Sequence, residues 1–163
     1  MTDWFKNDDL FFAQLKAGYD WQFLPAIFFR CCGLRVEIPK LTVRENVADA
    51  PAWTDSDTDL IVNGKVIEVK SRGERFTHPS DFPYDEPFVD TVTGYDAKSP
   101  KPFAYVFVSQ ITGCMVCVPS ETGKLFQIRE RYDRVRQIDE RFYVCQIRHL
   151  RTMDKLVSCL KEM

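Results

Sequence analysis

The chain has 163 residues, of which 45% are hydrophobic and 28% are charged, and its formal net charge is −2. This length and composition predict a single globular domain over residues 1–163, with enough aromatic bulk for a sizeable core. No apolar run is long enough to span a membrane, and the first residues lack the pattern of a secretory signal, so we expect an intracellular protein with no membrane partner.

Two helices are predicted at the start of the chain. Acidic residues open the first, over residues 7–18, because they interact favourably with the positive end of a helix. The second is expected from Asp20 to about Cys32 and ends at Gly33, a residue that commonly terminates helices. Pro25 is compatible with this helix only in its first turn.

A β-hairpin is the clearest local signal in the sequence. Residues 34–39 first form a short alternating pattern that predicts a half-buried strand, and residues 45–58 read as a loop. Asn63-Gly64 then lies between two runs of branched apolar residues, which is typical of a type I′ turn. A two-residue turn pairs Val62 with Lys65 and thereby fixes the register of both strands.

This register predicts a polar face on the hairpin. Asp59 lies opposite Glu68, and Asp57 lies opposite Lys70. Because side chains alternate along a strand, Asp59, Glu68 and Lys70 share one face. Opposed carboxylates destabilise a hairpin unless water or a cation separates them. Two carboxylates beside a lysine suit a hard divalent ion such as Mg²⁺, and a solvated polar face is the alternative.

The spacing also resembles a known family. Asp59, eight intervening residues and then Glu68-Val69-Lys70 across a hairpin are similar to the motif of the PD-(D/E)XK nuclease superfamily, although Thr58 stands where many members have proline. The resemblance covers residues 18–118. It implies an α/β, restriction-endonuclease-like fold, with a central mixed β-sheet that contains an antiparallel catalytic hairpin and is flanked by helices. It also implies that Asp59, Glu68 and the Val69 carbonyl bind Mg²⁺, or Mn²⁺ in its place, while Lys70 supports the attacking water.

Four further residues are candidates for the same site. The resemblance implies that an acidic residue of the first core helix reaches the metal, and Asp20 and Gln22 occupy that stretch, with helix capping as the alternative. Asp57 stands beside the expected carboxylate pair. Gln110 follows a predicted strand, where polar residues face ligands or simply form a turn.

Candidate contacts to nucleic acid lie after the hairpin. Residues 71–85 are rich in proline, glycine and charge, and they predict a long loop over the carboxylate face. Arg72, Arg75 and His78 in this loop are expected to meet a phosphate backbone, with a general acid or a plain surface residue as the alternatives for His78. Lys98 is expected to join them, near the end of a short helix or turn predicted over residues 88–98.

The second half of the chain predicts alternating strands and helices. Residues 103–109 read as a strand buried on both faces, and residues 114–118 as its neighbour. An amphipathic helix is expected over residues 125–135, a strand over 142–147 and a closing helix over 153–160. Residues 119–163 thus add helix and strand elements to the core.

These patterns lead to a functional hypothesis. We expect a Mg²⁺-dependent endo- or exonuclease of stand-alone or phage type, acting on DNA with RNA left open, and a homodimer if it cuts both strands; a viral source would place it in the host cytoplasm. Residues 121–163 carry 10 Lys and Arg against 7 Asp and Glu, which favours phosphate contact or a salt-bridged surface equally. The alternative hypothesis is a non-catalytic nucleic-acid-binding or protein-interaction module.

Overall fold

The computed structural model describes residues 20–39, 58–121, 123–133 and 138–163. In chain order the elements are α2 (Phe23–Cys31), β1 (Val36–Glu37), β2 (Leu60–Val62), β3 (Lys65–Arg72), η2 (Pro79–Asp81), β4 (Phe88–Thr91), α3 (Val92–Ala97), β5 (Ala104–Ser109), β6 (Met115–Pro119), β7 (Phe126–Asp133), β8 (Ile138–Cys145), η3 (Ile147–His149), β9 (Arg151–Thr152) and α4 (Met153–Lys161).

The larger of two sheets is mixed and has six strands in the order β1-β2-β3-β5-β6-β9. Strands β3 and β5 run parallel, and the other neighbours are antiparallel. The predicted α/β class with a mixed sheet and a hairpin is therefore confirmed. Every residue of β5 is buried, as its apolar sequence predicts for a central strand.

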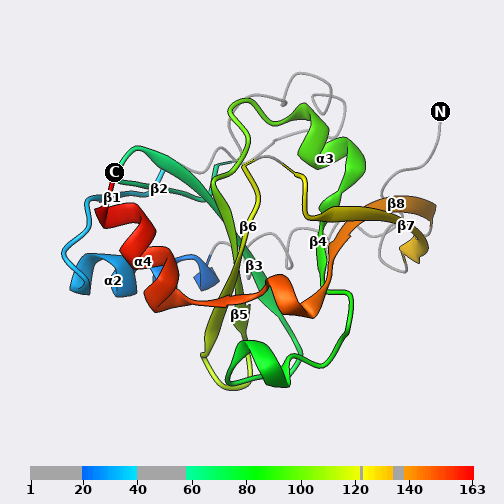
Figure 1. Ribbon diagram of the computed structural model, residues 1–163, viewed down its shortest axis with the longest axis horizontal. Coiled ribbons are helices and arrows are strands. Elements are labelled where there is room, and N and C mark those ends of the chain that lie inside the picture. The colour runs from blue at the N-terminus through cyan, green and yellow to red at the C-terminus, as the bar shows by residue number, and fades with distance from the viewer. Residues whose placement is uncertain (1–19, 40–57, 122, 134–137) are drawn as a thin grey trace.

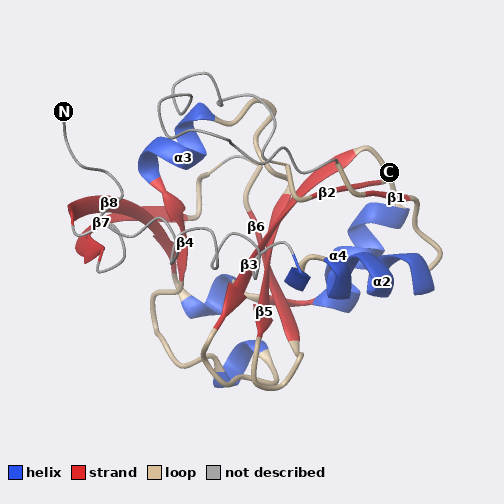
Figure 2. Ribbon diagram, turned by 180° about the vertical axis from the view of Figure 1, so that it is seen from behind, coloured by secondary structure: helices blue, strands red, loops and turns tan. Residues whose placement is uncertain are grey.

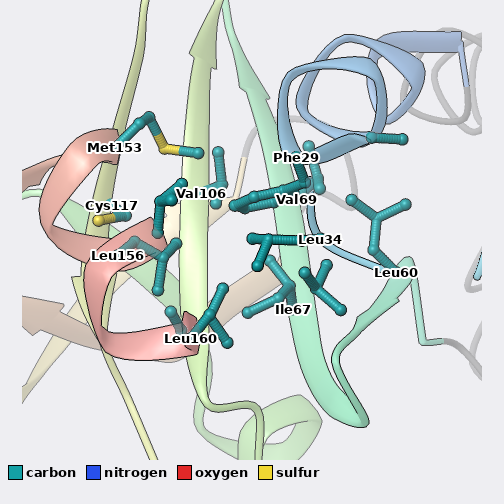
Figure 3. Close-up of a cluster of buried hydrophobic side chains, with 14 of the residues drawn as sticks. Phe29, Leu34, Leu60, Ile67, Val69, Val106, Cys117, Met153, Leu156 and Leu160 are labelled. Carbon is teal, nitrogen blue, oxygen red and sulfur yellow. The ribbon is translucent and has the colours of Figure 1, made fainter. Parts of the chain in front are cut away.

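Helices α2 and α4 cover one face of this sheet. Phe29 of α2 and Leu156 of α4 pack in the same cluster as Ile67 and Val106, which point from β3 and β5 toward the helices. Figure 3 shows this cluster, whose side chains lie between α4 at the left and α2 at the upper right. The side chains of Glu68, Lys70 and Tyr105 alternate with these apolar residues, so they project from the opposite face.

A second sheet lies on that opposite face. It has three antiparallel strands in the order β4-β8-β7, and the β7–β8 hairpin extends to the side of the molecule (Figures 1 and 2). Phe107 and Val116 of the large sheet pack against Val89 of β4 and Cys145 of β8. The carboxylate face of the hairpin is therefore an internal boundary between two sheets.

The N-terminal part of the described chain agrees with the sequence pattern. Helix α2 has Pro25 in its first turn, and Gly33 adopts φ +82° just after its end. Strand β1 is an edge strand, where a following proline is tolerated. The helix expected over residues 7–18 and nearly all of the loop expected over 45–58 lie outside the described residues.

The helix expected over residues 125–135 is wrong for residues 126–133, which form β7. Its partner is β8, with Phe126 opposite Cys145 and Ile128 opposite Tyr143. Apolar residues at 128 and 132 are four apart, which fits one helical face and also fits a strand, where every second residue shares a face. Pairing with β8 resolves the ambiguity in favour of the strand.

Residues 88–98 differ from the expectation of a short helix or turn in their first half. Phe88–Thr91 form β4 and pair with β8, and α3 follows immediately. The loop expected over residues 71–85 begins later, because β3 extends to Arg72. None of the described helices is long and apolar enough to cross a membrane.

Candidate functional site

The turn at Asn63-Gly64 sets the geometry of the site. Asn63 has φ +48° and Gly64 has φ +80°, as a type I′ turn requires. The strands pair Val62 with Lys65 and Leu60 with Ile67, so the predicted register is confirmed. The side-chain Nδ2 of Asn63 also donates to the Leu160 carbonyl at 3.0 Å, which ties the turn to the end of α4.

Asp59 lies just beyond the last paired residue of β2. Its Oδ2 accepts a hydrogen bond of 2.7 Å from the Val69 amide, at the point where the ladder between β2 and β3 ends. The N–H and C=O of one strand residue point to the same side. The Val69 carbonyl therefore faces the side on which Asp59 lies. The resemblance to the nuclease superfamily implies that this carbonyl is a metal ligand.

Close to Asp59 lies a deeply buried second carboxylate, that of Glu68. Its residue is 3% exposed, and its Oε1 is buried with no hydrogen-bond partner among the described residues. Burial and the nearby Asp59 raise the pKa of Glu68 to about 8, because burial disfavours the charged carboxylate and Asp59 repels a second negative charge. A buried oxygen of this kind is costly unless a cation or water meets it.

Two lysines and a second buried carboxylate complete the site. Lys70 Nζ lies 3.7 Å from Asp90 Oδ1 and 4.0 Å from Glu68 Oε2. Lys98 Nζ lies 3.2 Å from Asp90 Oδ2 and 3.8 Å from Glu68 Oε2. We refer to Asp59, Glu68, Lys70, Asp90 and Lys98 as the carboxylate–lysine centre.

Asp90 is held from several directions. It is 6% exposed, and it accepts hydrogen bonds from the Tyr105 hydroxyl, from Lys98 and from the Thr91 amide. Burial acts to raise the pKa of Asp90, but Lys70, Lys98 and the Tyr105 hydroxyl outweigh it and keep the pKa below its ordinary value. Asp90 is thus an anion inside the fold, and the pKa of Lys98 is raised because its two carboxylates outweigh its own burial.

Sequence reasoning missed Asp90 and Tyr105. Tyr105 is paired with Glu68 in the parallel ladder between β3 and β5, which no local pattern predicts. Asp90 reaches the centre because β4 belongs to the second sheet. The only local indication of a role for Asp90 is an acidic residue next to apolar ones, eight residues before Lys98, and this pattern is weak.

The predicted phosphate contacts occupy different settings. Lys98 lies in the centre. The Arg72 guanidinium lies 5.0 Å from the ring centroid of Phe88 and 4.9 Å from that of Phe107, and it donates to the Phe88 carbonyl. Burial lowers the pKa of Arg72 to about 10. Arg75 is exposed on the loop after β3.

The other predicted site residues lie away from the centre or are not described. His78 is exposed and caps η2 through Ser80 and Asp81. Gln110 is exposed, and it is five residues beyond Tyr105, which is roughly 16 Å along a strand. Asp57 lies outside the described residues.

The two candidates from the first core helix differ in burial. Asp20 is exposed, whereas Gln22 is 3% exposed, and its carbonyl accepts the Ala26 amide in the first turn of α2. Its side chain makes no cap hydrogen bond to the helix. Neither residue has a contact to the carboxylate–lysine centre among the described interactions.

The donor set limits what kind of ion could bind. Among the described residues, no three His, Cys, Asp or Glu side chains gather closely enough to hold a metal ion by themselves. A cation at the hairpin would therefore combine Asp59, Glu68 and a carbonyl with water, a mixed oxygen shell that Mg²⁺ accepts. The unpartnered Glu68 oxygen fits such an ion.

Comparison with known protein families, with curated proteins and with solved structures finds no match to this chain. Function is therefore inferred from the chemistry and geometry of the carboxylate–lysine centre.

Proposed function

We propose that the protein is a metal-dependent nuclease that hydrolyses phosphodiester bonds, with the hairpin as its active site. The observation that supports this proposal is the Glu68 carboxylate, whose Oε1 is buried without a hydrogen-bond partner among the described residues. Asp59 lies close enough to raise the pKa of Glu68, and Lys70 Nζ is 4.0 Å from Glu68 Oε2. A solvated polar hairpin would not bury this carboxylate. A divalent ion and a phosphate substrate explain why both charge types converge here.

Each residue has a role in this proposal. Asp59, Glu68 and the Val69 carbonyl hold Mg²⁺, or Mn²⁺ in its place. The bound ion supplies charge stabilisation at the transferred phosphoryl group and lowers the pKa of a water molecule. Lys70, on the same face of β3, orients the attacking water and offsets negative charge that develops on the phosphate. Lys98 provides a second cation for the same phosphate.

The fold supports this assignment through its element order. A helix, an edge strand, an antiparallel hairpin and then a parallel strand after a crossover form the core, and the candidate residues occupy the hairpin. We propose on this basis that the fold is restriction-endonuclease-like. DNA is the proposed substrate with RNA as the alternative, and cutting of both strands would require a homodimer. The proposed location is intracellular.

One observation favours a non-catalytic alternative. Lys70 and Lys98 each lie within 4.0 Å of both Glu68 and Asp90, so two lysines already face the two buried carboxyl groups. A structural ion-pair network of this kind needs no metal. It predicts a nucleic-acid-binding or protein-interaction module with no specific affinity for divalent ions.

Cleavage assays with labelled substrates distinguish the two proposals. Single-stranded, duplex, flapped and four-way DNA are incubated beside RNA with Mg²⁺, Mn²⁺ or EDTA. The variants are Glu68→Gln and Lys70→Ala, and Lys155→Ala on the exposed face of α4 is the matched control. Metal-dependent cutting that is lost in both variants and kept in the control supports the nuclease. Absence of both cutting and divalent-ion binding in the wild-type protein overturns it.

A further inference from the structure

Both lysines of the centre lie closer to Asp90 than to Glu68. The distance from Lys98 Nζ to Asp90 is 3.2 Å and that to Glu68 is 3.8 Å. For Lys70 Nζ the two distances are 3.7 Å and 4.0 Å. Only the contact between Lys98 and Asp90 is short enough to be a hydrogen bond among these four.

Two hydrogen-bond donors fix the position of Asp90, and neither of them donates to Glu68. The Tyr105 hydroxyl donates to Oδ2, and the Thr91 amide donates to Oδ1 at 2.9 Å. Thr91 in turn caps α3 by accepting the Gly94 amide at 2.9 Å, so the Asp90 side chain is anchored to the start of that helix. An anchored carboxylate holds its cationic partners in place.

The consequence appears at Glu68. Both lysines approach Oε2 at distances outside hydrogen-bond range, and Oε1 is buried without a partner. A lone buried carboxylate beside two lysines would normally draw at least one of them into a direct contact. Asp90 is the other buried carboxylate within reach of both lysines.

We propose that Asp90 is a positioning residue that draws Lys70 and Lys98 away from Glu68 and so keeps the Glu68 carboxylate open to a divalent cation. This inference rests on the proposed function, and it adds a residue that the hairpin motif does not contain. Without the negative charge of Asp90, Lys98 would move onto Glu68 and compete with the metal, because its Nζ lies 3.8 Å from Glu68 Oε2 against 4.0 Å for Lys70. Removal of that lysine should then restore metal binding.

The test is Mn²⁺ affinity, measured by electron paramagnetic resonance of free Mn²⁺ with no substrate present. Asp90→Asn keeps the shape of the side chain and removes its charge, and we expect Mn²⁺ to bind roughly 10- to 100-fold more weakly, the range seen when a supporting partner of a ligand is lost. The double variant Asp90→Asn with Lys98→Met should bind Mn²⁺ nearly as tightly as the wild type. Lys98→Met alone should bind more tightly than the wild type, which keeps the test valid if Asp90→Asn folds poorly.

The outcomes separate this inference from the proposed function. Unchanged affinity in Asp90→Asn overturns the inference and leaves the nuclease proposal standing. Weakened affinity that Lys98→Met does not rescue also overturns it, because Asp90 would then act as a ligand or as structural support. Failure of the wild-type protein to bind Mn²⁺ overturns the proposed function itself.

Discussion

The Val69 amide donates a 2.7 Å hydrogen bond to the Asp59 carboxylate, in the position where the main-chain carbonyl of Thr58 would otherwise continue the ladder. Asp59 therefore terminates the hairpin pairing as well as placing a charge beside Glu68. Substitution by alanine would remove both functions together. Substitution by asparagine separates them, because an amide oxygen still accepts the hydrogen bond.

We predict that Asp59→Asn lowers metal-dependent cleavage by about a hundredfold or more, because a neutral amide is a poor partner for a hard divalent ion. Its melting temperature in EDTA should equal or exceed that of the wild type, since the repulsion with Glu68 is gone. Cleavage assays and thermal unfolding on the same preparation check both points. Wild-type cleavage by Asp59→Asn would assign Asp59 to the ladder alone.

The stability of the metal-free protein should fall as pH rises from about 4.5 to about 8. Burial and Asp59 raise the pKa of Glu68 from 4.5 to about 8, so the folded state binds the Glu68 proton more tightly than the unfolded state does. This contribution is complete below the unfolded pKa and is lost as pH rises through the folded pKa. Urea unfolding in EDTA, with Glu68→Gln as reference, measures it. Parallel pH curves for the two proteins would contradict the prediction.

The hairpin turn should be sensitive to a single methyl group. Gly64 has φ +80° and open space around its Cβ position, so Gly64→Ala adds backbone strain without a clash, at a cost of roughly 1–2 kcal/mol. Gly73 also has open space, and its φ lies outside the left-handed region. Gly73→Ala is therefore the matched control and should leave the free energy of unfolding nearly unchanged. Equal effects of the two substitutions in denaturant titrations would argue against the type I′ geometry.

Arg72 and Arg75 should respond differently to alanine. Arg72 stacks on two aromatic rings and donates to a carbonyl, so Arg72→Ala should lower the free energy of unfolding by about 2 kcal/mol or more. Arg75 is exposed, and Arg75→Ala should change stability by less than about 0.5 kcal/mol.

The Arg75→Ala variant also tests a predicted contact to nucleic acid. If Arg75 meets a phosphate, Arg75→Ala weakens DNA binding and reduces the slope of log affinity against log salt by about 1. Binding titrations at several salt concentrations measure this slope. An unchanged slope would remove Arg75 from the interface.

Local sequence rules were enough to predict the hairpin, its register and its two faces. Asn63-Gly64 allows positive φ at both turn positions, and a two-residue turn leaves one pairing of the flanking strands. Strand β5 and helix α4 were equally predictable, because an apolar run and an amphipathic pattern each depend on neighbours within one element. Asp59, Glu68 and Lys70 could therefore be placed together from local rules.

The surroundings of that hairpin depend on contacts between segments that are distant in the sequence. Strand β7 depends on pairing with β8, because its apolar spacing fits a strand and a helix alike. Asp90 and Lys98 are more than twenty residues from Glu68. Asp90 reaches the site from β4 of the second sheet, and Lys98 reaches it from the end of α3, which follows β4. Tyr105 reaches it through a parallel ladder. Such contacts are set by packing between distant segments, and local propensity contains no information about them.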